Sequence, residues 1–581
     1  MSAFQVWLRL RSRAREYRRA EQVAAAMRNS PGPSSPRRGL RGLWPISIPC
    51  RSDAWFAFGV ATLWAALHNL TFWQHTAQAM WRPSASAIVF FASLTALVVL
   101  VQALLLLLMP TRWLMRAAAS VFSVIAALSS YFVQEYGAIM NKDMMRNVFG
   151  TDSAEVGALL NLDLLVYVVL LGLLPAWLVW RVALPPRSFL GQWRQRLIAT
   201  AVALAVAGAS VLASSAQYAV YLRAHKSIRY ELSPAAPVVS AAQVLLRMSG
   251  DHGVPPFVDL GQVGTRSGAP RTKPTVLFIV VGESARAANF QLGGYGRETT
   301  PALATLSDVV YFSNVSACGT STAVSVPCMF SPLGRRQFDV EKSPHVSNVF
   351  DSLSDAGWSV EWRENNAGCK GVCDRVKTIR YDARTGGPDC EHSYCYDEVM
   401  LTGLADQVRA LTTDTVIVFH LIGSHGPAYW ERYPATLERF RPSCRSNELH
   451  TCSAQELINT YDNTIAYTDR VVSRQIEILQ AASDVADGFL LYVSDHGESL
   501  GEKGVYLHGM PYALAPHAQT RVPLLIWASA GYLARRRIDV QCLGRQAAAP
   551  LSHDSVYHTI LGAAEVRDAV YRAEFDLLGS C

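Results

Sequence analysis

The stretch CGTSTAVSVPC, from Cys318 to Cys328, places four side-chain hydroxyls between two cysteines. The hydroxyls belong to Thr320, Ser321, Thr322 and Ser325. One interpretation is a disulfide-closed turn that leads into a helix, with one hydroxyl as its N-cap. The other is a nucleophile held in a fixed geometry. The stretch alone does not decide between a structural turn and a nucleophile.

Residues suited to metal chemistry occur at the ends of three apolar, β-branched segments. TVLFIVVGES ends with Glu283, TDTVIVFHLIGSHG contains His420 and His425, and GFLLYVSDHGES contains Asp495 and His496. Two carboxylates and an imidazole suit Zn²⁺, which takes oxygen and nitrogen ligands and leaves one tetrahedral position open. An alcohol from the first stretch would fill that position, since a metal-bound hydroxyl loses its proton more readily, as metal-bound water does. Each residue alone is more often structural, but their shared position favours a metal-dependent hydrolase or transferase.

The elements that must position these residues are six apolar segments that alternate with helical patterns. Strands that are apolar on both faces are expected in a mainly parallel sheet covered by helices. In such sheets, sites form beyond the carboxyl ends of the strands. The expected strands are 275–284, 309–317, 358–365, 413–426, 488–499 and 522–530. The C-terminal half is therefore predicted to be an α/β domain.

The N-terminal part has a different composition. A chain of 581 residues with 50% hydrophobic content is too apolar for an ordinary soluble protein. Its apolar segments are confined to about the first 220 residues, and several reach the roughly 20 residues that a helix needs to cross a bilayer. Five spans are expected, at 55–72, 87–109, 117–136, 164–180 and 197–218.

Arginines predict the orientation of these spans, because short cytoplasmic connections retain basic residues. They crowd the N-terminal tail and recur in two loops, at Arg112 and Arg116 and again between Arg181 and Arg196. The tail and both loops are therefore placed in the cytoplasm, and an odd number of spans exports the C-terminal half. The tail has no cleavable signal peptide, so the first span is expected to be an uncleaved anchor. The net charge of +7 reflects this topology, and no nucleic-acid partner is expected.

The cysteines agree with export. Of eleven cysteines, Cys50 alone precedes the soluble half. The others fall largely in close pairs, which are typical of disulfides in an oxidising compartment: Cys318/Cys328, Cys369/Cys373, Cys390/Cys395 and Cys444/Cys452. A four-thiolate zinc site made by the second and third pairs is the alternative. Cys542 and Cys581 would make a fifth bridge.

These observations divide the chain into four parts. Residues 1–52 form a basic cytoplasmic tail, 53–218 the transmembrane domain, 219–273 a connector and 274–581 the exported domain. Within the connector, SPAAPVVSAAQVLLRM predicts a turn and an amphipathic helix. That helix would lie along the membrane surface or pack against the protein core.

Five longer motifs resemble, in order and spacing, those of the lipid A phosphoethanolamine transferases, which include the mobile colistin-resistance enzymes of the alkaline phosphatase/sulfatase superfamily. The motifs are VVGESARAANFQLGGYGRETTP, CGTSTAVSVPCMF, HLIGSHGPAYWERYP, YDNTIAYTDR and YVSDHGESLGEKGVYLHGMPYALAP. The resemblance covers nearly the whole chain. It implies a monomeric bacterial inner-membrane enzyme with a periplasmic zinc site, which transfers phosphoethanolamine from phosphatidylethanolamine to lipid A through a phosphothreonine intermediate. Polymyxin tolerance is the implied phenotype.

The resemblance also implies roles for individual residues. Thr322 is the implied nucleophile, and the implied zinc ligands are Glu283, Thr322, Asp495 and His496. The residues implied to contact phosphate or transfer protons are Lys370, His425 and His508. Asn147, Thr151 and Glu155 lie four apart, so one helix would stack them on one face. The alternatives for that face are a plain amphipathic helix and, by resemblance, a site for the donor headgroup.

The chain departs from the family pattern in three places. Ser284 stands where the family usually has threonine, residues 1–50 form a longer extension, and only some members have the cysteines that flank Lys370. A phosphoglycerol transferase or a sulfatase is a competing function, but the sulfatase pattern C/S-x-P-x-R is absent around Thr322. A transferase acting on core heptose or a glycan, and an inactive membrane scaffold, are further alternatives. The intact set of four implied zinc ligands argues against the scaffold.

Overall fold

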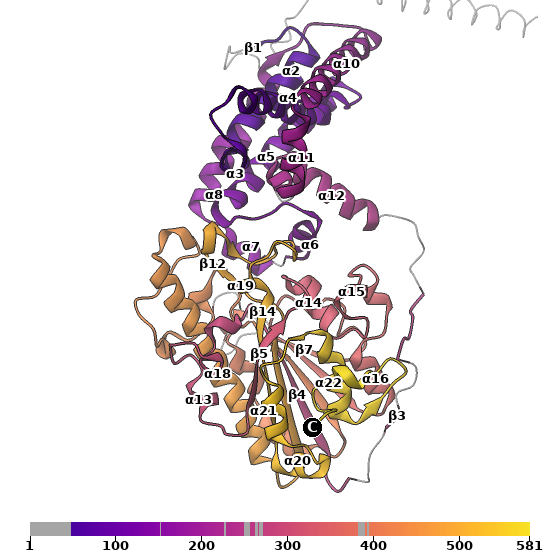
Figure 1. Cartoon of the computed structure of the whole chain (residues 1–581), viewed down its shortest axis with the longest axis vertical. Coiled ribbons are helices and arrows are strands. Elements are labelled where there is room, and N and C mark those ends of the chain that lie inside the picture. Colours follow the sequence, from indigo (N-terminus) through magenta and orange to yellow (C-terminus); the bar gives the residue numbers. More distant parts are fainter. Residues whose placement is uncertain are drawn as a thin grey trace, which may run out of the picture. The chain divides into compact units, whose positions relative to one another are not determined.

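The computed structural model describes residues 48–151, 153–225, 228–248, 256–261, 265–266, 271–381, 390–391 and 394–581 (Figure 1). The arginines of the predicted tail before residue 48 lie outside this range. Among the described residues, β1 (Ile48–Pro49) and β2 (Val182–Ala183) pair in parallel and belong to a small unit of their own. The remaining elements belong to the second unit.

Four helices of the described chain are long and apolar enough to cross a membrane. They are α4 (Ala85–Leu107), α5 (Arg112–Tyr136), the helix over Leu162–Arg181 and α10 (Phe189–Ala213). The third consists of α8 (Leu162–Tyr167), a π-helical segment (Val168–Leu173) and α9 (Leu174–Arg181). These four correspond to the second to fifth predicted spans. The last begins eight residues earlier than predicted, at Phe189 instead of 197, and α11 (Ser215–Ala224) follows it.

The structure divides the first predicted span, 55–72, into two helices. The helix α2 (Asp53–Leu67) has 15 residues, and α3 (Leu70–Met80) follows it. At 1.5 Å per residue α2 is about 22 Å long, less than the ~30 Å of a bilayer core. At the break, the Asn69 amide donates hydrogen bonds of 2.8 Å to the carbonyls of Trp64 and Ser233. The carbonyl of Trp64 also accepts from the backbone N–H of His68 at 3.0 Å, so the Asn69 amide adds a second bond there and ties the end of α2 to Ser233.

A buried ion cluster joins the two arginine-containing loops to the start of α2. Asp53 is fully buried, and its two carboxylate oxygens lie 2.8 Å from Nη2 of Arg112 and 2.8 Å from Nη2 of Arg196. Arg196 also donates to the carbonyl of Met109 at 2.6 Å. The loops that the arginine count assigns to one side of the membrane therefore meet at one carboxylate.

The C-terminal half contains an eight-stranded sheet in the order β15-β5-β14-β11-β4-β10-β6-β7. Its strands are β4 (Thr275–Gly282), β5 (Val310–Ser316), β6 (Ser359–Glu364), β7 (Lys377–Arg380), β10 (Thr415–His420), β11 (Asp487–Ser494), β14 (Arg521–Ala528) and β15 (Leu551–Ser552). Only β14 runs antiparallel to its neighbours, β11 and β5. The predicted α/β class and mainly parallel sheet are confirmed, and all six predicted strands belong to this sheet.

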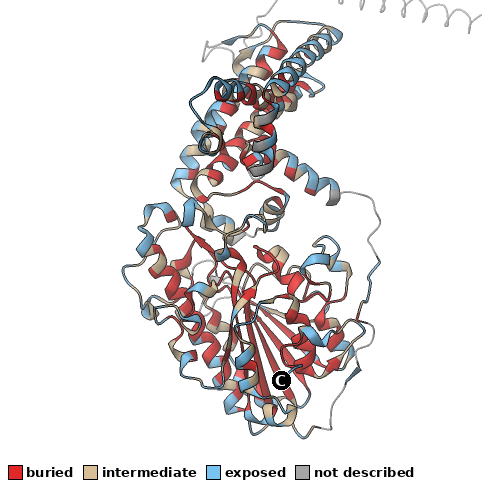
Figure 2. Cartoon of the chain, in the orientation of Figure 1, coloured by how far each residue is buried: buried red, intermediate tan, exposed pale blue. Residues whose placement is uncertain are grey.

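Helices cover both faces of the sheet, and its central strands are buried along their length (Figure 2). Along β4, Leu277 and Ile279 enter one core while Val276 and Phe278 enter the other, as the alternation of a strand requires. The first core is covered by α14 (Thr322–Met329), α16 (Val349–Asp355), α20 (Ala530–Arg536), α21 (Val540–Gln546) and α22 (Asp554–Ala564). The second is covered by α13 (Pro301–Ala304), α17 (Leu404–Ala410) and α18 (Ala454–Ala481).

Strand register brings distant parts of the sequence to one edge of this sheet. Gly282 at the end of β4 is paired with Ser494 at the end of β11, and Val281 is paired with His420 at the end of β10. The residues that follow these strands, Glu283 and Asp495, are therefore neighbours at the carboxyl edge.

Five disulfides connect the exported half. They are Cys318–Cys328, Cys369–Cys373, Cys390–Cys395, Cys444–Cys452 and Cys542–Cys581. Because Cys369 and Cys390 each have a disulfide partner of their own, the four-thiolate alternative does not describe this arrangement. Cys50 is the free thiol of the described chain.

The connector contains α12 (Ala235–Met248). Ala236 and Val244 pack in a small core with Met140 and Met145, whereas Leu246 is exposed. Part of α12 therefore packs against protein, and the alternative of a helix along the membrane surface stays a prediction.

We expect Asp53→Ala to lower the free energy of unfolding by about 3 kcal/mol, because it leaves the buried guanidinium of Arg196 without its carboxylate. Thermal unfolding of the purified full chain in detergent measures the effect. Asp308→Ala, which removes an exposed carboxylate, is the matched control and should change stability little. Equal midpoints for Asp53→Ala and wild type would contradict a structural role for the ion cluster.

Candidate active site

The cysteine-bounded stretch begins the helix α14, and Thr322 is the first residue of that helix. Ser321 occupies the N-cap position, but its side chain makes no capping hydrogen bond. The Thr322 hydroxyl donates to Oε2 of Glu283 at 3.0 Å and lies 3.4 Å from Nε2 of His496. Since the N-terminus of a helix carries positive potential, negative charge on this oxygen is stabilised there.

The other hydroxyls of the stretch hold the turn in place. Ser325 donates to the carbonyl of Asp495, and Thr320 donates to the carbonyl of Met510 at 2.6 Å. The ring of His553 accepts from the backbone N–H of Cys318 at 3.1 Å and donates to the carbonyl of Ser494 at 3.0 Å. Together with the Cys318–Cys328 disulfide, these bonds fix the turn to the end of β11. The stretch is therefore a turn fixed by a disulfide and hydrogen bonds, and this turn positions the Thr322 hydroxyl beside Glu283 and His496.

Glu283, Asp495 and His496 form a fully buried cluster whose potential ligand atoms all lie within 4.8 Å of one another. Nε2 of His496 is 3.3 Å from Oε1 of Glu283 and 3.4 Å from Oδ2 of Asp495. The other ring nitrogen, Nδ1, donates to the carbonyl of Gly497 at 2.9 Å. That bond selects the tautomer in which Nε2 carries a free lone pair directed at the cluster.

The charges of this cluster are not balanced by the described residues alone. Burial raises the pKa of Asp495 well above its ordinary value, and the neighbouring charge of Glu283 raises it further. Burial also acts to raise the pKa of Glu283, but the interactions with the rings of His496, His425 and His508 and the hydrogen bond from Ser284 outweigh it and lower that pKa. Oδ2 of Asp495 is buried and has no hydrogen-bond partner among the described residues.

A bound cation would remove this imbalance, because two adjacent buried carboxylates are costly without one. Two carboxylates, one imidazole nitrogen and the Thr322 oxygen make a four-donor set of the kind that Zn²⁺ binds. The orphaned oxygen of Asp495 and the free lone pair of His496 both face this set. The residues present therefore fit a zinc ion.

Two further histidines differ in their charge. Burial lowers the pKa of His425 to about 3, so its ring is neutral at pH 7. Burial acts in the same direction on His508, but Glu498, 2.8 Å from its Nδ1, raises the pKa of His508 to about 9. The ring centroid of His508 lies 5.6 Å from that of His425 and 4.3 Å from that of His496. A cationic proton donor thus stands beside the metal-ligand cluster.

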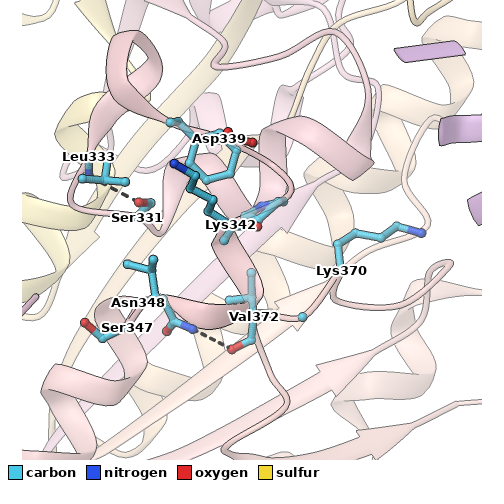
Figure 3. A pocket seen from close by; sticks show the side chains of 13 residues that line it. Ser331, Leu333, Asp339, Lys342, Ser347, Asn348, Lys370 and Val372 are labelled. Carbon is cyan, nitrogen blue, oxygen red and sulfur yellow. Dashed lines mark hydrogen bonds between the residues drawn. The ribbon is translucent and has the colours of Figure 1, made fainter. Parts of the chain in front are cut away.

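Lys370 lies in the loop closed by the Cys369–Cys373 disulfide, with a left-handed φ of 52°. Its ammonium donates to the carbonyl of Ala367 at 2.7 Å, and Asn366, three residues before Cys369, donates to Glu283 at 2.9 Å. Figure 3 shows Lys370 extending away from Val372 and Asn348. The hollow of about 20 Å³ in this view holds about one water, so it is too small for a substrate.

The prediction that one helix stacks Asn147, Thr151 and Glu155 was wrong. The helix α6 (Lys142–Gly150) ends before Thr151, which has the extended ψ of 132°, and Glu155 belongs to the separate helix α7 (Ser153–Leu159). The Thr151 hydroxyl bonds the carbonyl of Asn147 at 2.8 Å. A local side-chain to backbone bond of this kind competes with continuing the helix.

The three residues nevertheless line one cavity of about 150 Å³, together with His508. Most of the remaining lining is apolar: Phe132, Tyr136, Ile139, Met140, Met144, Val148, Leu159, Val505, Leu507 and Met510 belong to it. Oε1 of Glu155 lies 4.0 Å from Nε2 of His425. The cavity therefore joins an apolar chamber to the histidines of the candidate active site.

Sequence reasoning missed two residues that hold the site. Glu498 is fully buried and accepts hydrogen bonds from His508 and from the Tyr429 hydroxyl, at 2.8 and 2.6 Å. Asn366 connects Glu283 to the Lys370 loop. The sequence did contain a signal for Glu498, because this acid follows Asp495 and His496 in the motif SDHGES, at the same strand end. No signal in the sequence indicated that Asn366 reaches across to Glu283.

Comparison with known proteins now adds to this geometry. Residues 274–566 match the Sulfatase family model, and residues 97–248 match the model described as phosphoethanolamine transferase EptA/EptB. The phosphoethanolamine transferase EptA of Escherichia coli (strain K12) is 37% identical over 526 residues, which cover 88% of this chain and 94% of that protein. This chain belongs to the EptA/EptB phosphoethanolamine transferase family.

Other members of the EptA/EptB family show the same extent of similarity. The phosphatidylethanolamine transferase Mcr-1 of Escherichia coli is 37% identical over 519 residues, which cover 87% of this chain and 94% of that protein. The integral membrane lipooligosaccharide phosphoethanolamine transferase A of Neisseria meningitidis superposes with a TM-score of 0.87 at 33% identity, over 92% of this chain and 99% of that one. Both the helical part and the sulfatase-like domain are therefore shared with this solved structure.

The Glu498–His508 pair predicts a pH dependence of stability in the chelator-treated full chain. The folded pKa of His508, about 9, lies above its ordinary value of 6.5. The pair therefore contributes fully below pH 6.5, and its contribution of about 3 kcal/mol is lost as pH rises through about 9. Unfolding midpoints between pH 6 and 10 should fall more steeply for wild type than for Glu498→Gln. Glu574→Gln, at an exposed glutamate, should retain the wild-type slope.

Proposed function

We propose that this protein transfers phosphoethanolamine from phosphatidylethanolamine to lipid A, with Thr322 as the group that carries phosphoethanolamine between them. The observation that carries the proposal is the Thr322 hydroxyl, which stands at the start of α14 against Glu283 and His496. The names of the relatives support the chemistry, since they are phosphoethanolamine or phosphatidylethanolamine transferases. A related family member, 29% identical over half of this chain, is named for transfer to Kdo(2)-lipid A.

Glu283, Asp495, His496 and Thr322 would hold the zinc ion. When bound, Zn²⁺ would lower the pKa of the Thr322 hydroxyl and offset charge on the phosphoryl oxygens. The backbone around these residues keeps them in position: β4 and β11 are adjacent strands, and Ser325 ties the α14 turn to Asp495. The ligands are thus preorganised by the sheet.

In the first step, Oγ1 of Thr322 attacks the phosphorus of phosphatidylethanolamine, and the proton of the Thr322 hydroxyl passes to Oε2 of Glu283, 3.0 Å away. The bond from phosphorus to the diacylglycerol oxygen breaks, and phosphoethanolamine remains on Thr322. Cationic His508 is suited to give its proton to the leaving oxygen, since general acids act best when they hold a proton at the working pH. Lys370 would supply a point charge for the phosphoryl oxygens.

In the second step, an oxygen of lipid A attacks the same phosphorus and the bond to Thr322 breaks. A hydroxyl of the acceptor gives its proton to His508, which the first step left neutral. An ionised phosphate oxygen has no proton to give, and in that case His508 regains its proton from water. His425, neutral and 4.0 Å from Glu155, is placed to pass protons beside the cavity. Thr322 takes its proton back from Glu283 and returns to its starting state, so the two half-reactions share one site.

The donor headgroup would occupy the cavity lined by Asn147, Thr151 and Glu155. The carboxylate of Glu155 suits the ethanolamine cation, and the aromatic and methionine side chains suit the apolar part of the lipid. The five disulfides and the arginine distribution support a periplasmic catalytic domain on a protein of the bacterial inner membrane. Adding a cation to lipid A lowers the negative charge of the surface, so polymyxin tolerance should follow.

The nucleophile is tested by intact mass and peptide mapping of the full chain after incubation with phosphatidylethanolamine. We expect a phosphoethanolamine adduct on the peptide that contains Thr322, with none in Thr322→Ala. Thr322→Ser, which keeps the hydroxyl, should retain the adduct, and chelation of zinc should abolish it in both. An adduct on Thr322→Ala, or release of diacylglycerol without any adduct, would contradict the covalent route.

Glu155→Gln tests the headgroup site. Loss of the negative charge should raise the KM for phosphatidylethanolamine about tenfold, since a charge-assisted contact is worth roughly 1.5 kcal/mol. Release of diacylglycerol at varied donor concentration measures the change. Glu574→Gln serves as the matched control. Equal KM values for wild type and Glu155→Gln would remove Glu155 from headgroup recognition.

A further inference from the structure

A second cavity, of about 310 Å³, is lined by residues of β5 and β14, two strands that lie side by side in the sheet. Arg286, Tyr311, Ser313, His517 and Arg521 contribute to its lining. None of these residues belongs to the candidate active site or to the donor cavity. Arg521 is paired in the sheet with Ser316, at the carboxyl end of β5, so the cavity opens near the same edge as the metal-ligand cluster.

The polar lining of this cavity is rich in cationic donors. The guanidinium of Arg521 bonds neutral oxygens, the side-chain carbonyl of Asn314 at 2.5 Å and the hydroxyl of Ser316 at 3.0 Å. Within the described part of the chain, no ion pair is found for Arg521. Nε of Arg286 is buried without a hydrogen-bond partner there, although Nη1 lies 2.8 Å from Glu502. At least one positive charge at this cavity is therefore not neutralised by the protein.

The remaining polar groups also favour an anion. His517 is exposed at the cavity and adds ring nitrogens. Burial raises the pKa of the Tyr311 hydroxyl, so it keeps its proton and can donate. No aspartate or glutamate contributes to the described lining. Two guanidinium groups in one hollow suit a phosphate monoester, whose oxygens they bind in pairs.

The chain places this cavity within reach of the nucleophile. Arg286 is three residues from Glu283, so their Cα atoms are at most about 11 Å apart. On the other wall, the backbone of Gly497, next to His496, donates to the carbonyl of Gln519 at 3.0 Å. Arg286 is therefore close to Glu283 along the chain. The segment that contains Arg521 is hydrogen-bonded to the residue that follows His496.

We propose that this cavity binds a phosphate monoester of the acceptor glycolipid, at a point on the acceptor away from the oxygen that receives phosphoethanolamine. This inference rests on the proposed transfer to lipid A. An acceptor with phosphates on both sugars of a disaccharide would present one end to Thr322 and the other to Arg286 and Arg521. On this proposal, the cavity favours bis-phosphorylated acceptors over mono-phosphorylated ones.

The test measures binding without chemistry, in full-length Thr322→Ala protein in nanodiscs. A soluble bis-phosphorylated glucosamine disaccharide and its mono-phosphorylated counterpart are titrated by calorimetry. We expect the bis-phosphorylated ligand to bind about tenfold more tightly. Adding Arg521→Gln should remove that preference, and His517→Asn, at an exposed residue with little influence on folding, should reduce it about threefold. Arg409→Gln, an equal charge change at an exposed residue in α17 before β10 begins, should leave it intact.

Equal affinities of the two ligands, or an unchanged preference in both Arg521→Gln and His517→Asn, would overturn the proposal. A competition arm identifies the source of the phosphate. If nanodiscs that contain phosphatidylglycerol abolish the preference as effectively as Arg521→Gln does, the cavity binds phospholipid headgroups and the proposal is wrong; persistence of the preference supports it. Because these measurements need no transfer, a missing adduct on Thr322 would defeat the proposed function while leaving the binding result readable.

Discussion

The whole catalytic half depends on two carboxylates, Glu283 and Asp495, that the sheet holds side by side away from water. The pairing of Gly282 with Ser494 makes this proximity unavoidable, because each acid directly follows its strand. Isolated burial of such a pair is costly, so the surrounding groups all act on its charge. Asn366 and Ser284 donate to Glu283, His496 presents a lone pair, and α14 directs its N-terminus at the same point. The two buried carboxylates therefore favour a bound cation, and the donor atoms around them suit a metal ion.

The same buried surroundings give two histidines, His425 and His508, different protonation states. His425 and His508 lie close together, yet burial keeps the first neutral and the buried carboxylate of Glu498 keeps the second protonated. Two groups whose pKa values are driven apart make a natural acid and base pair. One glutamate, Glu498, creates this difference in pKa between His425 and His508. Which histidine donates a proton and which accepts one therefore depends on the surroundings of each ring.

Features of the fold and the candidate site that depend on short segments of the sequence were predictable, whereas features that depend on contacts between distant segments were not. Continuous apolar, β-branched segments predicted the sheet, and the rule for strand ends predicted where Glu283, Asp495 and His496 would meet. The direction of β14 was not predictable, because an apolar segment has no polarity of its own. The break at Thr151 was missed because helical periodicity was extended across a side-chain to backbone bond. Asn366 acts on Glu283 from 83 residues away, a relation that only the fold creates.

The place of β14 in the sheet has a consequence for how the protein is made. This strand, at Arg521–Ala528, lies between β11 and β5, and β5 ends more than 200 residues before it. A nascent chain that has emerged only to residue 520 therefore has β5 separated from the other strands, with two long apolar edges open to solvent. Such edges pair readily with foreign strands, and contacts between distant segments form slowly. The edges of β5 and β11 therefore stay exposed until β14 has been made, and the sheet closes only after Ala528 has joined the chain.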